Sequence, residues 1–146
     1  MKILLLAEVS AERVIGGAER VLRQQAVGLV AAGHQVDLLT RATDEAAAAE
    51  IAIGGAKEWR FSVSKSNEWS FVRSTVRGAL SVLDRLTRKN SYDMAIIHQA
   101  LAGLGPLYLR RNAAAEWLYV CHSLAHEEYL TRTAGATSLF SKMRRH

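Results

Sequence analysis

The chain has 146 residues and a net charge of +5, with 49% hydrophobic and 23% charged residues. This length fits one domain, and the composition excludes a disordered chain and indicates a substantial core. The single cysteine, Cys121, excludes a disulfide framework, and no apolar run is long enough for a secretory signal or a membrane-spanning helix. The sequence therefore predicts a cytoplasmic protein, with peripheral contact to a membrane as a further option.

The first forty residues predict a strand, a glycine turn, a helix and a second strand. Ile3–Ala7 is a continuous apolar run, typical of a strand that is covered on both faces in a parallel sheet. A polar loop then leads to Gly16-Gly17. Apolar residues recur at helical spacing over Ala18–Ala32. Gly33 follows where a left-handed helix cap would fall, and Val36–Leu39 is the expected second strand.

The rest of the chain continues this alternation of strands and helices. We expect a short helix at Asp44–Ile51, a peripheral strand at Glu58–Val63, a long helix at Ser66–Lys89, a strand at Asp93–Ile97, a helix at Ala100–Arg111 interrupted near Gly105-Pro106, and a strand at Trp117–Cys121. A short helix and a basic tail follow. The pattern predicts an α/β fold: a Rossmann-like open parallel sheet in the order 3-2-1-4-5, with helices on both faces.

Ligands of such sheets bind beyond the carboxyl ends of the strands, where the strand order reverses. In the predicted order this point lies between the first and fourth strands. Three loops that are distant in the sequence are expected to meet there: those after the first, fourth and fifth strands. The residues that they bring to this crevice are Gly16, Gly17, His98, Gln99, His122 and Ser123.

The glycine pair places two residues without side chains at the start of a helix. Free N–H groups and the helix dipole favour an anion such as phosphate at this position. The alternative is a plain tight turn, because the sequence contains neither the dinucleotide-binding GxGxxG spacing nor a phosphate-binding P-loop. Glu19 has two readings as well: a structural carboxylate of the first helical turn, or a group that hydrogen-bonds substrate hydroxyls.

His98 and His122 each follow an apolar strand. Each imidazole is either a buried structural group or a hydrogen-bond partner and proton carrier in the crevice. We expect Cys121 and His122 to diverge, since neighbouring residues of a strand point to opposite faces. His126, Glu127 and Glu128 lack metal-ligand spacing, so the sequence predicts no metal site there.

The long helix has an apolar stripe and a mostly basic opposite face that includes Arg73, Arg77 and Arg88. Together with Trp69 and Phe71, this face is either a membrane or nucleic-acid surface or an ordinary solvated face. The aromatic residues are not interleaved with the basic ones, which favours the solvated face and predicts no nucleic-acid partner.

Several segments of the chain resemble one known protein family. Its opening, MKILLLAEVSAERVIGGAERVLRQQAVGLVAAGHQVDLLTR, resembles the start of the N-terminal lobe of retaining GT-B glycosyltransferases of family 4. The resemblance is carried by the apolar strand, by GGAER at the helix start and by AGHQVDLLT at the helix exit. YDMAIIHQA and EWLYVCHSLAHEEY resemble the ends of that lobe's fourth and fifth strands. The similarity is weakest between Asp44 and Asn90.

The resemblance implies transfer of a sugar from a nucleotide diphosphate sugar to a sugar or lipid-linked acceptor. Gly16 and Gly17 would contact the donor's diphosphate through backbone amides, with Glu19 beside them. His122 would lie at the sugar-transfer centre, and His98 matches the family less closely. The resemblance implies no metal and no cofactor other than the nucleotide sugar co-substrate.

The family would continue beyond His146 with further strands and a donor-binding lobe. Residues 1–146 are therefore expected to be a single acceptor-side domain, incomplete at its C-terminal end and inactive alone. Two alternatives remain: a stand-alone module that binds an anion, and a non-catalytic subunit completed by a separate donor-lobe chain. An uncovered cleft surface also predicts self-association.

Overall fold

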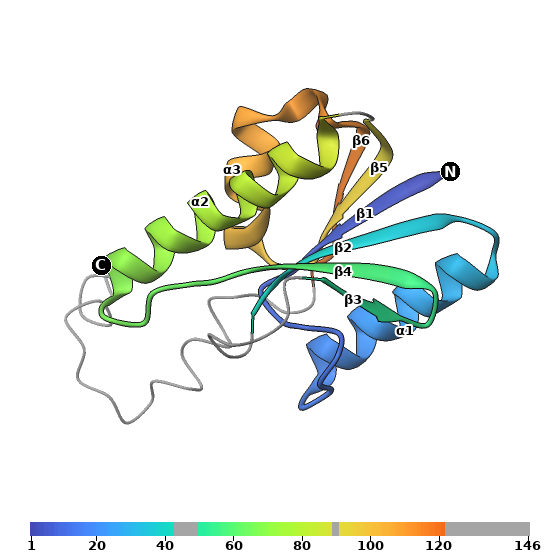
Figure 1. Ribbon diagram of the computed structural model, residues 1–146, viewed down its shortest axis with the longest axis horizontal. Coiled ribbons are helices and arrows are strands. Elements are labelled where there is room, and N and C mark those ends of the chain that lie inside the picture. Colours follow the sequence, from blue (N-terminus) through green and yellow to red (C-terminus); the bar gives the residue numbers. More distant parts are fainter. Residues whose placement is uncertain (43–49, 89–90, 122–146) are drawn as a thin grey trace.

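The observed strands and helices follow the alternation that the sequence predicts. The computed structural model describes residues 1–42, 50–88 and 91–121. In chain order the elements are β1 (Lys2–Leu6), α1 (Gly17–Ala31), β2 (Gln35–Arg41), β3 (Glu50–Ile53), β4 (Ala56–Phe61), α2 (Glu68–Thr87), β5 (Tyr92–Ile97), α3 (Ala100–Leu109), the 3₁₀ turn η1 (Arg111–Ala113) and β6 (Ala114–Tyr119) (Figure 1).

The strands form one sheet in the order β3-β4-β2-β1-β5-β6. All neighbouring strands are parallel except β3 and β4, which pair antiparallel. Without β3, this is the predicted order 3-2-1-4-5, so the expected α/β fold is confirmed with one further edge strand. Helix α1 covers one face of the sheet, and α2 and α3 cover the other (Figure 1).

Each face of the sheet has its own apolar core, and β1 contributes to both. Leu4 and Leu6 pack under α2 and α3, while Leu5 packs under α1 against Leu22. All four leucines are fully buried. Burying one such side chain stabilises the fold by about 1.5–3 kcal/mol, which explains why the central strand is a continuous apolar run.

The exit of α1 confirms the cap predicted at Gly33. This residue has φ of +84°, in the left-handed region that glycine adopts without a steric cost. Its N–H donates to the carbonyl of Val30 at 2.9 Å, and the N–H of His34 donates to the carbonyl of Leu29 at 3.0 Å. This pair of hydrogen bonds is the Schellman motif, which ends the helix and turns the chain into β2.

The prediction of a short helix at Asp44–Ile51 is wrong for its last two residues, which belong to β3. Residues 43–49 lie outside the described part of the chain. Gly54 and Gly55 join β3 to β4, with φ values of +54° and +89°. A two-residue hairpin turn of type I′ needs positive φ at both positions, so the glycine pair favours an antiparallel hairpin, and the last two residues of the expected helix belong to its first strand.

Two predicted strands are shifted along the chain. The strand expected at Glu58–Val63 is β4, Ala56–Phe61, and the strand expected at Trp117–Cys121 is β6, Ala114–Tyr119. Pairing sets these bounds, because β6 begins where its first residue lies opposite the first residue of β5. Cys121 therefore lies beyond the end of β6. The expectation that Cys121 and His122 diverge assumed that both belong to a strand, so strand geometry does not support it.

The interruption predicted near Gly105-Pro106 is also wrong, because α3 continues from Ala100 to Leu109. Proline has a helical φ and removes only one donor from the helix. Gly105 lies against α2: a Cβ atom there would come within 2.9 Å of the side chains of Val76 and Leu80. The two residues thus allow a close contact between helices instead of ending one.

Candidate functional site

The loop after β1 and the turn after β5 meet at the carboxyl edge of the sheet. These strands are neighbours, and from this edge the chain leads to α1 on one face and to α3 on the other. The N–H of Glu8 donates to Oε1 of Gln99 at 2.6 Å. Two of the three loops that the sequence places at the crevice are therefore joined here, at the strand-order reversal where open α/β sheets bind ligands.

Glu8 is a residue of this edge that sequence reasoning missed. Its carboxylate accepts the N–H groups of Leu101 at 2.8 Å and Ala102 at 3.3 Å, in the first turn of α3. Burial raises the pKa of the Glu8 carboxyl above its usual range, and these bonds and the charge of Arg41 offset only part of that effect. The sequence signal that could have identified Glu8 is its position directly after an apolar strand.

The start of α1 carries the predicted glycine pair. Gly16 is the N-cap residue, with an extended backbone, and its N–H donates to Oε2 of Glu19 at 3.1 Å. Glu19 therefore makes the structural first-turn contact that was one of its two readings. An anion at the N–H of Gly16 would have to displace this carboxylate.

Gly17 has open space around it. A Cβ atom there would have no atom within 4 Å, and its φ is not positive. Neither packing nor backbone conformation requires glycine, which costs a helix about 0.5–1 kcal/mol relative to alanine. Within the described residues no acceptor pairs with the N–H groups of Gly17 and Ala18. The first turn of α1 is thus open to a closely approaching acceptor.

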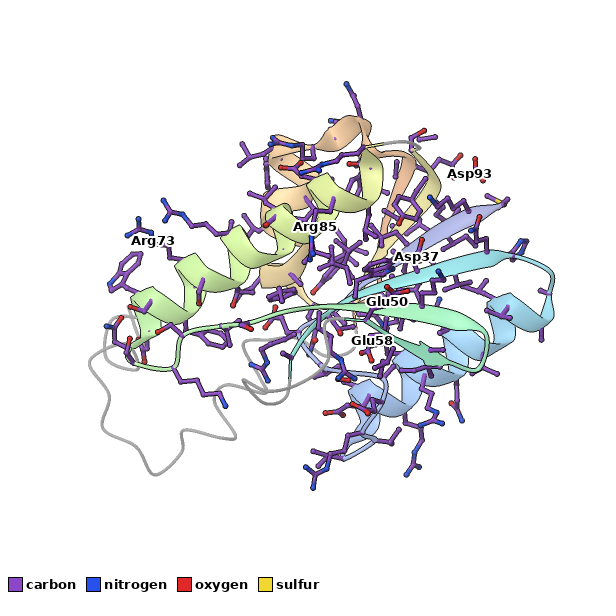
Figure 2. The ribbon with its side chains drawn as sticks, viewed as in Figure 1. Asp37, Glu50, Glu58, Arg73, Arg85 and Asp93 are labelled. Atoms are coloured by element: carbon purple, nitrogen blue, oxygen red, sulfur yellow. The ribbon has the colours of Figure 1, made fainter. Side chains whose placement is uncertain are left out.

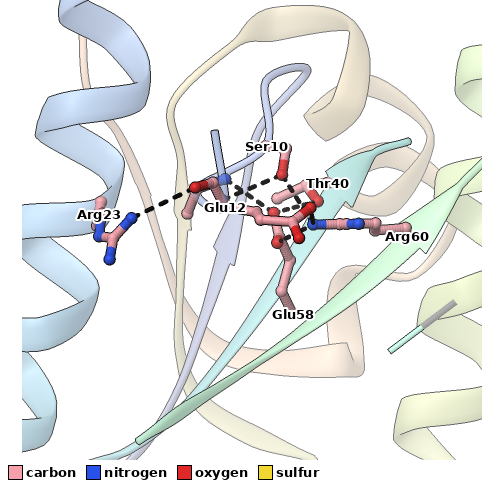
Figure 3. Close-up of polar contacts among 7 residues, drawn as sticks. Ser10, Glu12, Arg23, Thr40, Glu58 and Arg60 are labelled. Atoms are coloured by element: carbon pink, nitrogen blue, oxygen red, sulfur yellow. Dashed lines mark hydrogen bonds and ion pairs between the residues drawn. The ribbon is translucent and has the colours of Figure 1, made fainter. Parts of the chain in front are cut away.

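A buried polar cluster holds the middle of the β1–α1 loop against the sheet (Figure 3). Oε1 of Glu58, on β4, accepts the N–H of Ala11 and the hydroxyl of Thr40, each at 2.8 Å. Nη2 of Arg60 donates to Oε2 of Glu58 at 2.9 Å and to the hydroxyl of Ser10 at 3.1 Å. The loop is therefore fastened to β2 and β4 several residues before its glycines.

Arg60, whose side chain is 2% exposed, forms ion pairs with two carboxylates of this cluster, those of Glu12 and Glu58. Burial acts to lower the pKa of Arg60, but the hydrogen bonds and charges of Glu12 and Glu58 outweigh it and raise the pKa, so the guanidinium stays charged. Arg23 of α1 donates to the carbonyl of Glu12 at 3.3 Å. Glu12 therefore links the loop to both β4 and α1 (Figure 3).

His98 lies beneath the edge rather than on its surface. It is 3% exposed, and its Nε2 lies 2.6 Å from Oε1 of Gln25 on α1. Its backbone N–H donates to the carbonyl of Leu6 at 2.8 Å. These contacts are those of a buried structural imidazole. A role for His98 in lining the crevice stays a prediction.

His122 and Ser123 lie outside the described residues, as do His126, Glu127 and Glu128. Cys121 is exposed beyond the end of β6. Over residues 1–42, 50–88 and 91–121, no three His, Cys, Asp or Glu side chains gather in a way that could hold a metal ion. In the same residues no helix is both long and apolar enough to cross a membrane.

A groove of about 780 Å³ lies away from the glycine loop, between α3 and β6. Its lining is mainly apolar and aromatic, with Leu107, Tyr108, Trp117 and Tyr119 among its residues. Arg111 is its one charged side chain among the described residues. Among the described residues the groove is lined by no carboxylate or histidine, so we place the candidate site at the carboxyl edge, where the polar loops meet.

Comparisons with known proteins agree with this fold. The model of Glycosyltransferase Family 4 matches residues 15–146. Sucrose-phosphate synthase from Thermosynechococcus elongatus is similar in structure, with a TM-score of 0.74 and 21% identity over 92% of this chain and 36% of that one. The calicheamicin glycosyltransferase CalG4 has a TM-score of 0.54 and 15% identity, over 91% of this chain and 37% of that one. No curated protein sequence matches.

Proposed function

The chain belongs to Glycosyltransferase Family 4, and from this premise we propose that it is the acceptor-side part of an enzyme that transfers a sugar from a nucleotide diphosphate sugar. The acceptor would be a sugar or a lipid-linked sugar. The fold is that of an N-terminal GT-B lobe, and the chain spans only 36% of the similar synthase. Sugar transfer by a complete enzyme is therefore proposed for this chain rather than shown.

The observation that carries this proposal is the open first turn of α1 at Gly17. The N–H groups of Gly17 and Ala18 and the positive end of the helix would bind the donor's diphosphate. The polar cluster around Glu58 holds the preceding loop in place, so these donors are arranged before the ligand arrives. Donors of this kind, aimed at the charge that develops on a leaving group, each contribute about 3 kcal/mol in enzymes.

The remaining predicted residues have different places in this proposal. Gln99 lies at the joined edge, beside Glu8, where it can orient an acceptor. We assign His122 to the sugar-transfer centre and His98 and Ser123 to the crevice, as the resemblance and the loop order imply. We expect the isolated chain to transfer no sugar, because stabilising the charge of the leaving diphosphate would also require groups from a separate donor lobe.

Gly17→Val tests the site directly. Its branched side chain would block approach to the first turn of α1, while its Cβ atom would have no atom of the chain within 4 Å. We expect this change to weaken binding of a nucleoside diphosphate, such as UDP, GDP or ADP, about tenfold or more, the cost of one or two charge-assisted hydrogen bonds. Isothermal titration of the isolated chain measures the affinity.

Gly28→Val is the matched control, because Gly28 is also on α1 and a Cβ there likewise meets nothing within 4 Å. It should leave nucleotide affinity unchanged. Equal affinities of the wild type and Gly17→Val for the nucleotide would contradict the assignment. Binding of inorganic phosphate that matches binding of the nucleotide would instead favour the stand-alone anion-binding module.

A further inference from the structure

The outer side of α2 is a row of arginines. We call Arg73, Arg77, Arg85 and Arg88 the α2 arginine face; all four are exposed. The buried residues of the helix, Thr75, Ala79, Val82 and Leu83, lie on its opposite side and pack toward the sheet. Arg73 extends from α2 away from the sheet in Figure 2. At 1.5 Å per residue the row is about 22 Å long.

Few negative charges offset this row. None of the four arginines forms an ion pair with another described residue. The acidic residues of α2 are Glu68 and Asp84, and Asp84 already accepts two hydrogen bonds from Arg110, at 2.6 and 3.1 Å. The α2 arginine face therefore presents a positive potential to whatever lies beyond it.

Exposed aromatic and apolar side chains also occur on the two helices of this side of the sheet. Trp69, in the first turn of α2, is 80% exposed. Helix α3 lies on the same side of the sheet and exposes Leu104 by 45% and Tyr108 by 77%. Tryptophan and tyrosine have an apolar ring with a polar tip, and they concentrate where proteins meet the boundary between lipid headgroups and acyl chains.

We propose that the α2–α3 side of the domain docks on the surface of an anionic phospholipid bilayer. The arginines would contact the phosphate headgroups, and Trp69 would enter the interface at one end of the row. This inference does not depend on the sugar transfer proposed above. It rests on the charge and exposure of α2 and α3 alone.

The placement of the aromatic residues favours a lipid surface over a nucleic acid. Single strands are bound by aromatic rings interleaved with basic residues, whereas Trp69 precedes the row and Tyr108 belongs to another helix. The apolar side of α2 is already buried in the core, so the helix cannot insert lengthwise as a free amphipathic helix would. The contact is therefore adsorption, and it weakens as salt is added.

The test uses the isolated chain and vesicles of phosphatidylglycerol mixed with phosphatidylcholine. We expect cosedimentation with these vesicles at low salt, release at high salt, and no binding to pure phosphatidylcholine. Each basic residue near an anionic surface contributes about a fivefold factor, so Arg73→Gln/Arg77→Gln should lower the partition coefficient about 25-fold. Vesicles should shift tryptophan emission to the blue in the wild type but far less in Trp69→Phe.

Arg20→Gln/Arg23→Gln is the matched control, because it removes the same charge from exposed residues of α1, on the opposite face of the sheet. Glutamine is a good helix former, and thermal melting confirms that both pairs of variants are folded. No binding of the wild type to the anionic vesicles would overturn the proposal. An equal loss in both variant pairs, or tighter binding to a single-stranded oligonucleotide than to vesicles, would also overturn it.

Discussion

Two buried charged residues on β4, Glu58 and Arg60, decide how the β1–α1 loop is held. The sequence shows Trp59 and Phe61 alternating with them, and this pattern predicts a strand with one apolar and one solvated face. The structure buries the charged side as well, because the loop before α1 lies over Glu58 and Arg60. Alternation in one strand cannot reveal a loop that folds back from elsewhere in the chain, so the sequence alone does not predict this cluster.

Arg60→Met tests the cluster. The change leaves Glu58, which is fully buried, without its cation, and breaking one side of a buried ion pair costs about 3–5 kcal/mol. We expect a loss of this size in the free energy of unfolding measured with urea. Hydrogen exchange at the N–H of Ala11 should also become faster, since that group donates to Glu58.

Arg110→Met is the comparison for this experiment, because its ion pair with Asp84 is exposed. Exposed pairs contribute little to stability, so we expect a much smaller change there. A stability loss at Arg60 no larger than that at Arg110 would show that the cluster does not hold the loop.

Glu8 makes stability depend on pH in a defined direction. The folded chain holds a proton on its carboxyl more tightly than the unfolded chain does, because burial raises the folded pKa. The contribution of Glu8 is therefore greatest at low pH and is lost as the pH rises through the raised value. Glu8→Gln keeps an oxygen acceptor for Leu101 and Ala102 but cannot ionise.

We therefore expect the stability of Glu8→Gln, relative to the wild type, to increase as the pH rises above the ordinary glutamate value. The difference should level off above the folded-state pKa. Urea unfolding of both proteins over a pH series measures it. A difference that stays constant over the series, or that decreases with pH, would contradict the assigned direction.

At the scale of elements, the sequence predicts most of the fold because local pattern and packing agree. The apolar β1, the stripe of α1 and the cap at Gly33 all describe one βαβ unit, and the structure contains it. The errors at α3 and β6 occur where tertiary contacts prevail over local pattern, whereas the error at β3 concerns a local turn. The β3–β4 hairpin follows from the positive φ of Gly54 and Gly55, and the glycine pair between alternating Ile51, Ile53 and Trp59 was the signal that could have identified it.

The close contact of α3 with α2 makes Gly105 sensitive to substitution. In Gly105→Ala the new methyl group would lie 2.9 Å from side-chain carbons of Val76 and Leu80. We expect a net loss of about 1–2 kcal/mol in the free energy of unfolding, because overpacking costs more than the gain in helix propensity.

Gly28→Ala separates propensity from packing. The added methyl group meets nothing in α1, so this change should stabilise the protein by up to about 1 kcal/mol. Chemical denaturation of both variants measures the two effects. A stabilised Gly105→Ala protein would show that α2 and α3 are packed less tightly than the structure describes.

At the scale of the whole molecule, the two faces of the sheet have different roles in our proposals. The α1 side supplies the glycine turn, at the edge where Glu8 and Gln99 join two loops. The α2–α3 side supplies the basic and aromatic surface. The sequence places the glycine turn correctly because a helix start has a local signature. It does not predict the contacts of Glu8 and leaves two readings of His98 open, since the contacts of both residues depend on how distant segments meet.

Our central claim is that the first turn of α1 binds the diphosphate of a nucleotide sugar. The most direct measurement follows the backbone amide resonances of the ¹⁵N-labelled chain while a nucleoside diphosphate is added. We predict the largest shifts at Gly17 and Ala18, whose N–H groups lie at the positive end of the helix. Shifts confined to the groove between α3 and β6, or no shift at Gly17 at saturating nucleotide, would contradict the claim.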